Sequence, residues 1–311
     1  MNLQQLRIVR ETARRQFNLT AVSASLFTSQ SGVSKHLRDL EDELGVVLFE
    51  RRGKRLLGLT EPGEVVLRSV ERILSEIDTI RQSSQQFAHS DSGTLRIATT
   101  HTQARYALPS VLKAFQSKFP KVRLELHQCS PEEIVTMLKS GDVDVGIATE
   151  ALLSNSTTFA CFPFYRWHHS VIVPQGHSLD SAAPLTLKAL AEHPVITYHS
   201  GYTGRANIDE AFRKAGLQPE IAMSAVDADV IKTYVELGLG AGIIASVAFD
   251  PQRDVGLRQL SGDALFPSNT TLLAIRRSGF LRSYLYDFLQ LCSPELTRGA
   301  IDDSLIGHEE A

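Results

Sequence analysis

Cations and hydrogen-bonding side chains gather in two short segments near the start of the chain. From residue 30 to residue 38 they share one face of an expected helix, opposite the apolar Val33, Leu37 and Leu40. Four more cations lie around Gly53. Donors at the start of a helix can reach base edges in a DNA major groove, and a basic turn can lie along the phosphates. The residues that we predict to contact DNA are Ser29, Gln30, Ser31, Ser34, Lys35, Arg38, Arg51, Arg52, Lys54 and Arg55.

The charge distribution favours this prediction over a helix-turn-helix that binds no DNA. Residues 1–60 contain 10 Lys and Arg against 6 Asp and Glu, and the totals of 32 and 35 leave 22 against 29 for the rest of the chain. A basic N-terminal segment followed by an acidic remainder is typical of a DNA-binding module joined to a sensor domain.

The spacing of apolar residues predicts the elements that position these side chains. Helices are expected over residues 2–16, 18–27 and about 30–44, followed by a basic wing over residues 49–56. Thr60 and Pro62 mark the start of a long helix that ends near residue 87. Its apolar residues recur at heptad spacing, and they are Val66, Val70, Ile73, Ile77 and Ile80. Because residues 1–60 are too small to bury such a helix, we expect it to pack on a partner chain, with packing on its own domain as the alternative.

After a polar hinge at residues 83–92, short strands alternate with helices. Strands are expected at residues 95–99, 122–126, 143–148, 170–173, 195–198, 221–223, 242–245 and 271–275. This alternation predicts parallel sheets with crossover helices, and its restart near residue 170 predicts a second lobe. The late strand and a final helix over residues 280–291 are expected to return to the first sheet.

These elements define an expected α/β architecture with distinct domains. The expected domains are a winged helix-turn-helix at 1–60, a linker and dimerisation helix with hinge at 61–92, a two-lobed effector-binding domain at 93–294, and a loose polar tail at 295–311. Lobe I is expected to contain about residues 93–163 and 268–294, and lobe II about residues 164–267. Such paired lobes bind small ligands in the cleft between them.

Hydroxyl and amide side chains are expected to face that cleft. Three loops supply them, each at a strand end or ahead of a helix, and the candidate residues are Thr100, Thr102, Gln103, Thr149 and Thr203. Free backbone N–H groups and the positive end of a helix dipole favour an oxyanion such as sulfate at such a position. Thr and Ser are also good helix caps, so geometry alone leaves both interpretations open.

Over its whole length the sequence resembles the LysR-type transcriptional regulators. The segments that carry this resemblance are Ser29-Gln30-Ser31, Leu40-Glu41-Asp42-Glu43-Leu44-Gly45, Leu48-Phe49-Glu50-Arg51 and Thr60-Glu61-Pro62-Gly63. The segments at residues 98–106, 166–170 and 227–235 resemble the CysB and Cbl branch, which regulates cysteine and sulfur assimilation, and residues 28–34, 56–58 and 166–170 lean toward Cbl-like members. Ser31 departs from the wider family, where a proline is common, but a serine at a helix start can cap it.

The resemblance implies a periplasmic-binding-protein-like effector domain and a regulator, expected to be an activator, of sulfur-starvation or organosulfur genes. It implies that a sulfate-type anion is held by residues matching the five cleft residues above. The expected partners are a double-stranded DNA operator, a small effector, RNA polymerase, and further copies in a homodimer or homotetramer. No cofactor is expected beyond an effector such as sulfate, thiosulfate, adenosine phosphosulfate, acetylserine or an organosulfonate, and no metal is expected.

Other classes of protein fit the sequence less well. His168 and His169 are adjacent, which makes a poor metal pair, and no nucleophile motif of the Gly-x-Ser-x-Gly kind is present. A solute-binding protein shares the two lobes, but it should carry an export signal instead of a DNA-binding head. Three widely spaced cysteines, and the lack of a signal peptide or an apolar membrane segment, lead us to expect a cytoplasmic protein.

Overall fold

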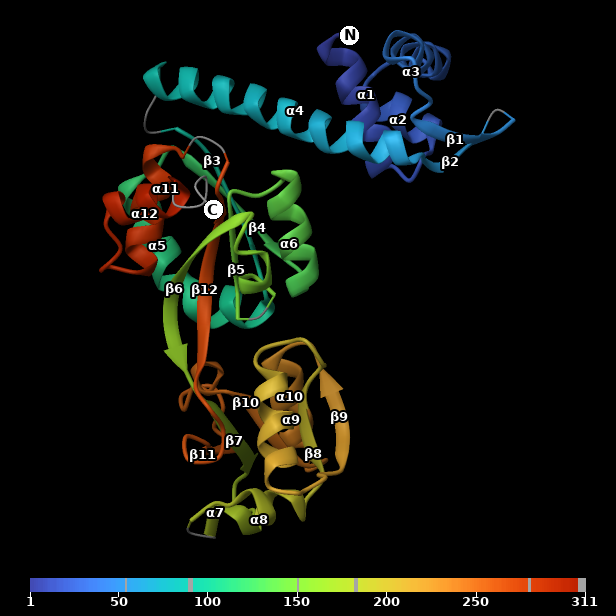
Figure 1. The fold of residues 1–311 in the computed structure, drawn as a ribbon. Coiled ribbons are helices and arrows are strands. Elements are labelled where there is room, and N and C mark those ends of the chain that lie inside the picture. The colour runs from blue at the N-terminus through green and yellow to red at the C-terminus, as the bar shows by residue number, and fades with distance from the viewer. Residues whose placement is uncertain (54, 89–91, 150, 182–183, 279–280, 307–311) are drawn as a thin grey trace. The chain divides into compact units, whose positions relative to one another are not determined.

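The structure is a computed structural model that describes residues 1–53, 55–88, 92–149, 151–181, 184–278 and 281–306. It divides into two compact units, Met1–Ala88 and His89–Ala311 (Figure 1). None of the helices in these described ranges is both long enough and apolar enough to cross a bilayer.

The first unit is a winged helix-turn-helix followed by a long helix, as the sequence predicts. Its elements are α1 (Leu3–Arg14), α2 (Leu19–Ser25), α3 (Gln30–Leu44), β1 (Phe49–Arg52), β2 (Arg55–Leu59) and α4 (Glu61–Ala88). Asn18 caps α2 through its side-chain oxygen, which accepts from the amides of Thr20 and Ala21. Thr60 caps α4 in the same way, by accepting from the amide of Gly63. Gly63 is required there, because a Cβ would lie 2.0 Å from the carbonyl oxygen of Leu48.

More of the apolar stripe of α4 packs within its own unit than the sequence predicts. Val70 and Leu74 are buried in the core of this unit, where Val66 and Ile77 also pack. Ile73 and Ile80 are 39% and 68% exposed. The prediction that the whole stripe faces a partner chain is therefore wrong in part, because α1 packs along the first half of α4 and covers it. The helix also continues through residues 83–88 of the expected hinge, and residues 89–91 lie outside the described ranges.

Lobe I of the second unit is built on a five-stranded sheet with the order β4-β3-β5-β12-β6. Its strands are β3 (Gly93–Thr99), β4 (Val122–Gln128), β5 (Val145–Ala148), β6 (Phe159–Trp167) and β12 (Asn269–Arg276). Its helices are η1 (Gln103–Ala107, a π-helix), α5 (Leu108–Lys118), α6 (Pro131–Ser140), η2 (Leu153–Asn155), α11 (Ser283–Cys292) and α12 (Arg298–Ile306).

Lobe II is built on a second sheet with the order β11-β7-β10-β8-β9. Its strands are β7 (His169–Pro174), β8 (Val195–Tyr198), β9 (Ile221–Ala225), β10 (Ala241–Ala245) and β11 (Leu257–Ser261). Its helices are α7 (Ser178–Ser181), α8 (Leu187–Ala191), α9 (Arg205–Lys214), α10 (Ala228–Glu236) and η3 (Ser246–Ala248). The chain crosses between the lobes at Trp167–His169 and again between Ser261 and Asn269, as the long β6 and β12 in Figure 1 indicate.

Two expectations for this unit are wrong. Both sheets are mixed, because β12 runs antiparallel to β5 and β6, and β7 runs antiparallel to β10 and β11. The reversed strands are β12 and β7, and the sequence argument predicted both as strands. It overlooked β6 and β11, which pair with these reversed strands at one edge of each sheet. The expected loose tail contains α12, whose Ile301 is fully buried against the core of lobe I. The prediction that the late strand rejoins the first sheet is confirmed by β12.

Candidate DNA interface and effector cleft

The helix α3 presents the predicted DNA-contacting side chains on its exposed face. Val33, Leu37 and Leu40 are buried, which leaves Gln30, Ser31, Lys35 and Arg38 exposed and Ser34 half-buried. The cap of α3 is Ser29, which accepts from the amide of Gly32 at 3.0 Å. Ser31 therefore does not cap the helix itself, and its hydroxyl lies 3.1 Å from that of Ser29.

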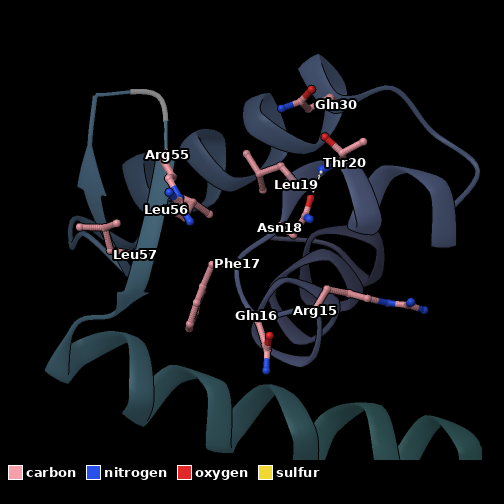
Figure 2. A pocket seen from close by; sticks show the side chains of 10 residues that line it. All are labelled: Arg15, Gln16, Phe17, Asn18, Leu19, Thr20, Gln30, Arg55, Leu56 and Leu57. Carbon is pink, nitrogen blue, oxygen red and sulfur yellow. Dashed lines mark hydrogen bonds between the residues drawn. The ribbon is translucent and has the colours of Figure 1, made fainter.

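An open groove joins the start of α3 to the wing (Figure 2). It has a volume of about 690 Å³ and is lined by Arg15, Gln16, Phe17, Asn18, Leu19, Thr20, Gln30, Arg55, Leu56 and Leu57. These side chains come from the turn after α1, from α2, from the start of α3 and from β2 of the wing. The sequence argument did not name Arg15 and Thr20, which line the same groove as Arg55.

The cations of the wing differ in their ion pairing and their exposure. Arg51 forms an ion pair at 2.5 Å with Glu41, a buried carboxylate on α3. Glu41 also accepts from the backbone amides of Leu48 and Phe49. This makes Arg51 part of the joint between α3 and the wing, whereas Arg52 and Arg55 are exposed on the two strands. The predicted contact Lys54 lies outside the described residues.

Four of the five predicted cleft residues come from strand ends of lobe I. Thr100, Thr102 and Gln103 follow β3, and Thr149 follows β5. These two strands are parallel neighbours, with Thr99 beside Ile147, so both loops leave the sheet at the same edge. Thr102 and Gln103 are each only 1% exposed. The hydroxyl of Thr99 donates to the Ile147 carbonyl, so this side chain supports the sheet instead.

The buried side chains at this edge of the sheet differ in their hydrogen bonds. The Oε1 atom of Gln103 accepts from the phenol of Tyr165 at 2.7 Å, which leaves the amide hydrogens of Gln103 as donors. Burial raises the pKa of Tyr165, so its phenol keeps the proton that it donates. The Oγ1 atom of Thr102 is buried, and no described residue meets it with acceptable hydrogen-bond geometry, although the Tyr198 phenol of lobe II lies beside it. A buried hydroxyl in this state is unusual and favours a missing partner such as a ligand.

The fifth predicted residue, Thr203, comes from the loop after β8 in lobe II. It is 3% exposed and has a positive φ of 44°, and Gly204 follows with a φ of 70°. A β-branched residue rarely adopts this left-handed conformation, so the surroundings must hold it in place. The same loop faces lobe I, because a Cβ on Gly201 would lie 3.8 Å from a carboxylate oxygen of Glu132 on α6.

An ion-paired cluster joins the two lobes beside the cleft. Tyr106 of η1 donates to Asp229 of α10 at 2.5 Å, and Arg105 and Lys232 pair with the same carboxylate. Burial and the bond to Asp229 raise the pKa of Tyr106 to about 12. Burial alone would lower the pKa of Lys232, but hydrogen bonds to Tyr106, Asp254 and Asp229 outweigh it and raise that pKa.

One group of side chains near the cleft has the atoms to hold a metal ion. The ligand atoms of His101, Asp227 and Asp229 lie within 4.8 Å of one another. Asp229 is already bound to Lys232 and Arg105, and Asp227 accepts from the amide of Val230 as the cap of α10. Because two cations already neutralise Asp229, we assign no metal to this group.

Family models match both units. The model of the LysR substrate binding domain matches residues 88–297, and that of the bacterial regulatory helix-turn-helix proteins of the lysR family matches residues 3–64. The chain therefore belongs to the LysR family, which confirms the resemblance of its sequence and its predicted fold. Regulators of this family bind DNA operators and small effectors and form oligomers.

Similar proteins place the chain more narrowly within this family. It is 52% identical to the HTH-type transcriptional regulator SsuR of Burkholderia cenocepacia, over 97% of each chain. It is also 52% identical to the HTH-type transcriptional regulator Cbl of Escherichia coli, over 96% of this chain and 94% of that protein. The crystal structure of the cofactor-binding domain of the Cbl transcriptional regulator matches with a TM-score of 0.67 and 49% identity, over 69% of this chain and 93% of that one. The chain is a transcriptional regulator and not an enzyme.

Proposed function

We propose that this regulator controls genes of sulfur assimilation or organosulfur use in response to a small sulfur-pathway anion bound between the lobes of its effector domain. The observation that carries the anion site is the buried hydroxyl of Thr102, which lacks a well-formed hydrogen bond. The similarity to SsuR and Cbl supports the choice of genes.

The chemistry of the cleft supports an oxyanion that carries no proton. The candidate ligands are three threonine hydroxyls of the two facing loops, the hydroxyl of Thr149 and the Gln103 amide, and this set contains no cationic side chain. Gln103 can act only as a donor there, because Tyr165 already occupies its oxygen. Neutral donors of this kind can stabilise sulfate, or the sulfur end of a larger ester or sulfonate, without a counter-ion.

The proposed mechanism couples the cleft to DNA. The α3 face and the wing hold the operator in a dimer or tetramer, and the anion alters lobe closure and thereby the spacing of the DNA-binding units. Such a shift can be no larger than the difference in affinity of the anion for the two arrangements. We further expect the protein to act in the cytoplasm and, as an activator, to contact RNA polymerase at the promoter.

The test uses the full chain and a panel of candidate anions. Sulfate, thiosulfate, adenosine phosphosulfate, acetylserine and an organosulfonate are added in a thermal-shift experiment, in which a ligand that binds the folded form raises the Tm. Binding to promoter fragments of sulfur-uptake genes is then measured by fluorescence anisotropy with and without each anion. We expect at least one anion to raise the Tm and change the DNA affinity. If none did either, the proposed effector control would be wrong.

A further inference from the structure

Two buried polar residues lie where the chain crosses between the lobes. His169 is the first residue of β7, directly after the first crossing, and Asn269 is the first residue of β12, directly after the second. Asn269 is paired with Trp167 in the sheet of lobe I. His169 is fully buried and Asn269 is 3% exposed. A change in the closure of the two lobes must therefore change the backbone conformation near these two positions.

A chain of hydrogen bonds leads from this crossing to the Thr203 loop. The Nδ2 atom of Asn207 donates to Oδ1 of Asn269 at 2.8 Å, and Nδ2 of Asn269 lies 3.4 Å from Nδ1 of His169. On the other side of the ring, Nε2 of His169 lies 3.0 Å from the carbonyl oxygen of Thr203. A carbonyl can only accept, so Nε2 carries the proton and Nδ1 is left to accept from Asn269. Every donor in this relay therefore points toward Thr203.

The surroundings keep the imidazole of His169 neutral. Trp167 and Phe266 pack against it edge to face, with ring centroids 5.0 and 5.7 Å away. Burial is the main reason that its pKa falls to about 4, and the neighbouring His168 lowers it further, against the hydrogen bond to Thr203. A second proton on Nδ1 would face the amide hydrogens of Asn269, so the relay exists only in the neutral form.

The relay ends at a strained piece of backbone. Thr203 and Gly204 both have positive φ, and a Cβ on Gly204 would lie 2.3 Å from Oδ1 of Asn269 and 2.8 Å from Cε1 of His169. The hydrogen bond from His169 meets the Thr203 carbonyl at this point of the backbone. The same backbone conformation fixes the direction of the Thr203 side chain, because the left-handed backbone determines where its Cβ points.

We propose that His169, in its Nε2–H tautomer and oriented by Asn269, is a positioning residue that holds the Thr203 loop in its anion-binding form and couples that loop to the crossing between the lobes. This inference rests on the proposed function, since it takes Thr203 to be an anion ligand. Thr203 would contact the anion, and His169 would act through it without touching the anion. Lobe closure and the conformation of this loop then change together.

The first test needs no ligand. Hydrogen–deuterium exchange of the full chain is measured for the peptides that cover residues 199–207 in three variants. In His169→Phe the ring remains but the donor is lost, and we expect exchange in this loop to rise about tenfold. In His169→Gln the amide nitrogen can still donate to Thr203, and the exchange rate should stay within about threefold of the wild type. The control is Leu190→Ala, which opens the core of lobe II away from the loop. Equal exchange in His169→Phe and the wild type, or an equal rise in Leu190→Ala, would overturn the positioning role.

The second test measures the binding of sulfate by calorimetry in the wild type and the two His169 variants, together with Asn269→Leu and Thr102→Ala. We expect His169→Phe and Asn269→Leu to lose about tenfold or more in affinity, and His169→Gln to stay within about threefold. Thr102→Ala, a change in a proposed anion ligand, reports on the site itself. Loss of affinity in Thr102→Ala but not in His169→Phe would overturn the relay and leave the anion site standing. If the wild type bound no anion of the panel, the proposed function would fail instead, even where the exchange experiment supported the relay.

Discussion

The two functional surfaces of this regulator are built in opposite ways. The proposed DNA interface consists of exposed side chains on one face of α3 and on a two-stranded wing, and each is placed by its own element. The proposed effector site consists mostly of buried side chains from loops of two lobes, and its geometry depends on contacts between residues far apart in sequence, such as Gln103 with Tyr165. This difference predicts which properties substitutions at each surface should change. Changes at the exposed, unpaired side chains of the first should alter DNA affinity alone, whereas changes at the buried side chains of the second should alter ligand binding.

The largest expected effect is at the exposed surface. The double change Lys35→Ala and Arg38→Ala removes two cations of α3 and should weaken operator binding by about 100-fold, because each contact to a base or phosphate contributes about 1–3 kcal/mol. The melting temperature should change little, since both side chains are exposed. Fluorescence anisotropy at fixed salt gives the affinity. The matched control is the loss of two exposed cations of the second unit, Lys121→Ala and Lys188→Ala. Wild-type affinity in the α3 variant would remove this helix from the DNA interface.

The next effect tests the buried surface. Thr102→Ala removes a buried hydroxyl that lacks a well-formed hydrogen bond. Thr100→Val replaces the hydroxyl of a second buried threonine by an isosteric methyl group. Each should weaken anion binding by about tenfold, the equivalent of one hydrogen bond to a charged group. DNA affinity without the anion should not change. Calorimetry with the anion identified in the thermal-shift panel gives the affinity, and Thr136→Ala, which removes an exposed hydroxyl of α6, is the control. Unchanged anion affinity in both cleft variants would show that the anion lies elsewhere.

A smaller effect concerns pH. The unfolded chain binds a proton at His169 with an ordinary pKa near 6.5, but burial lowers the pKa in the folded protein to about 4. Protonation therefore favours unfolding, and stability falls as the pH drops from about 6.5 toward about 4. By about pH 5.5 the wild type should have lost about 1 kcal/mol that His169→Gln, which does not titrate, retains. Urea unfolding at several pH values gives this difference. Parallel pH profiles for the two proteins would mean that His169 titrates normally in the folded state.

The smallest effect separates two neighbouring arginines. Arg52 is exposed on β1, so Arg52→Ala should lower the slope of log affinity against log salt by about one and leave the Tm unchanged. Arg51 is paired with the buried Glu41, so Arg51→Ala should lower the Tm as well, because it leaves that carboxylate uncompensated. Melting curves and anisotropy at several salt concentrations distinguish the two. The same Tm in both variants would show that the ion pair contributes nothing to stability.

The sequence predicted the exposed surface well because its signals are local. The spacing of Val33, Leu37 and Leu40 defines the buried face of α3 and leaves Lys35 and Arg38 outside. Asn18 and Thr60 cap the helices that the sequence predicts to begin beside them, since capping involves residues two or three positions away. The sequence also predicted strands with a strong apolar alternation, such as β3 and β4, close to the bounds that the structure shows.

The parts that escaped prediction depend on contacts over long distances in the chain. β6 has a proline and polar residues that blur its alternation, and only its pairing with β12 makes it a strand. The ion pair of Arg51 joins residues ten positions apart. The adjacent His168 and His169 were considered only as a poor metal pair, because nothing in the sequence places Asn269 beside them. Their neighbours are set by the order of strands in the folded sheets.

The C-terminal helix α12 has a practical consequence for anyone who isolates the effector domain. The family match ends at residue 297, one residue before α12 begins. A fragment cut at that boundary would lose Ile301, which packs in the same core as Phe288, and would expose apolar surface of α11 to water. Such a truncated fragment should aggregate more readily than one that continues to residue 306. Recombinant design should follow the buried helix and not the edge of the sequence profile.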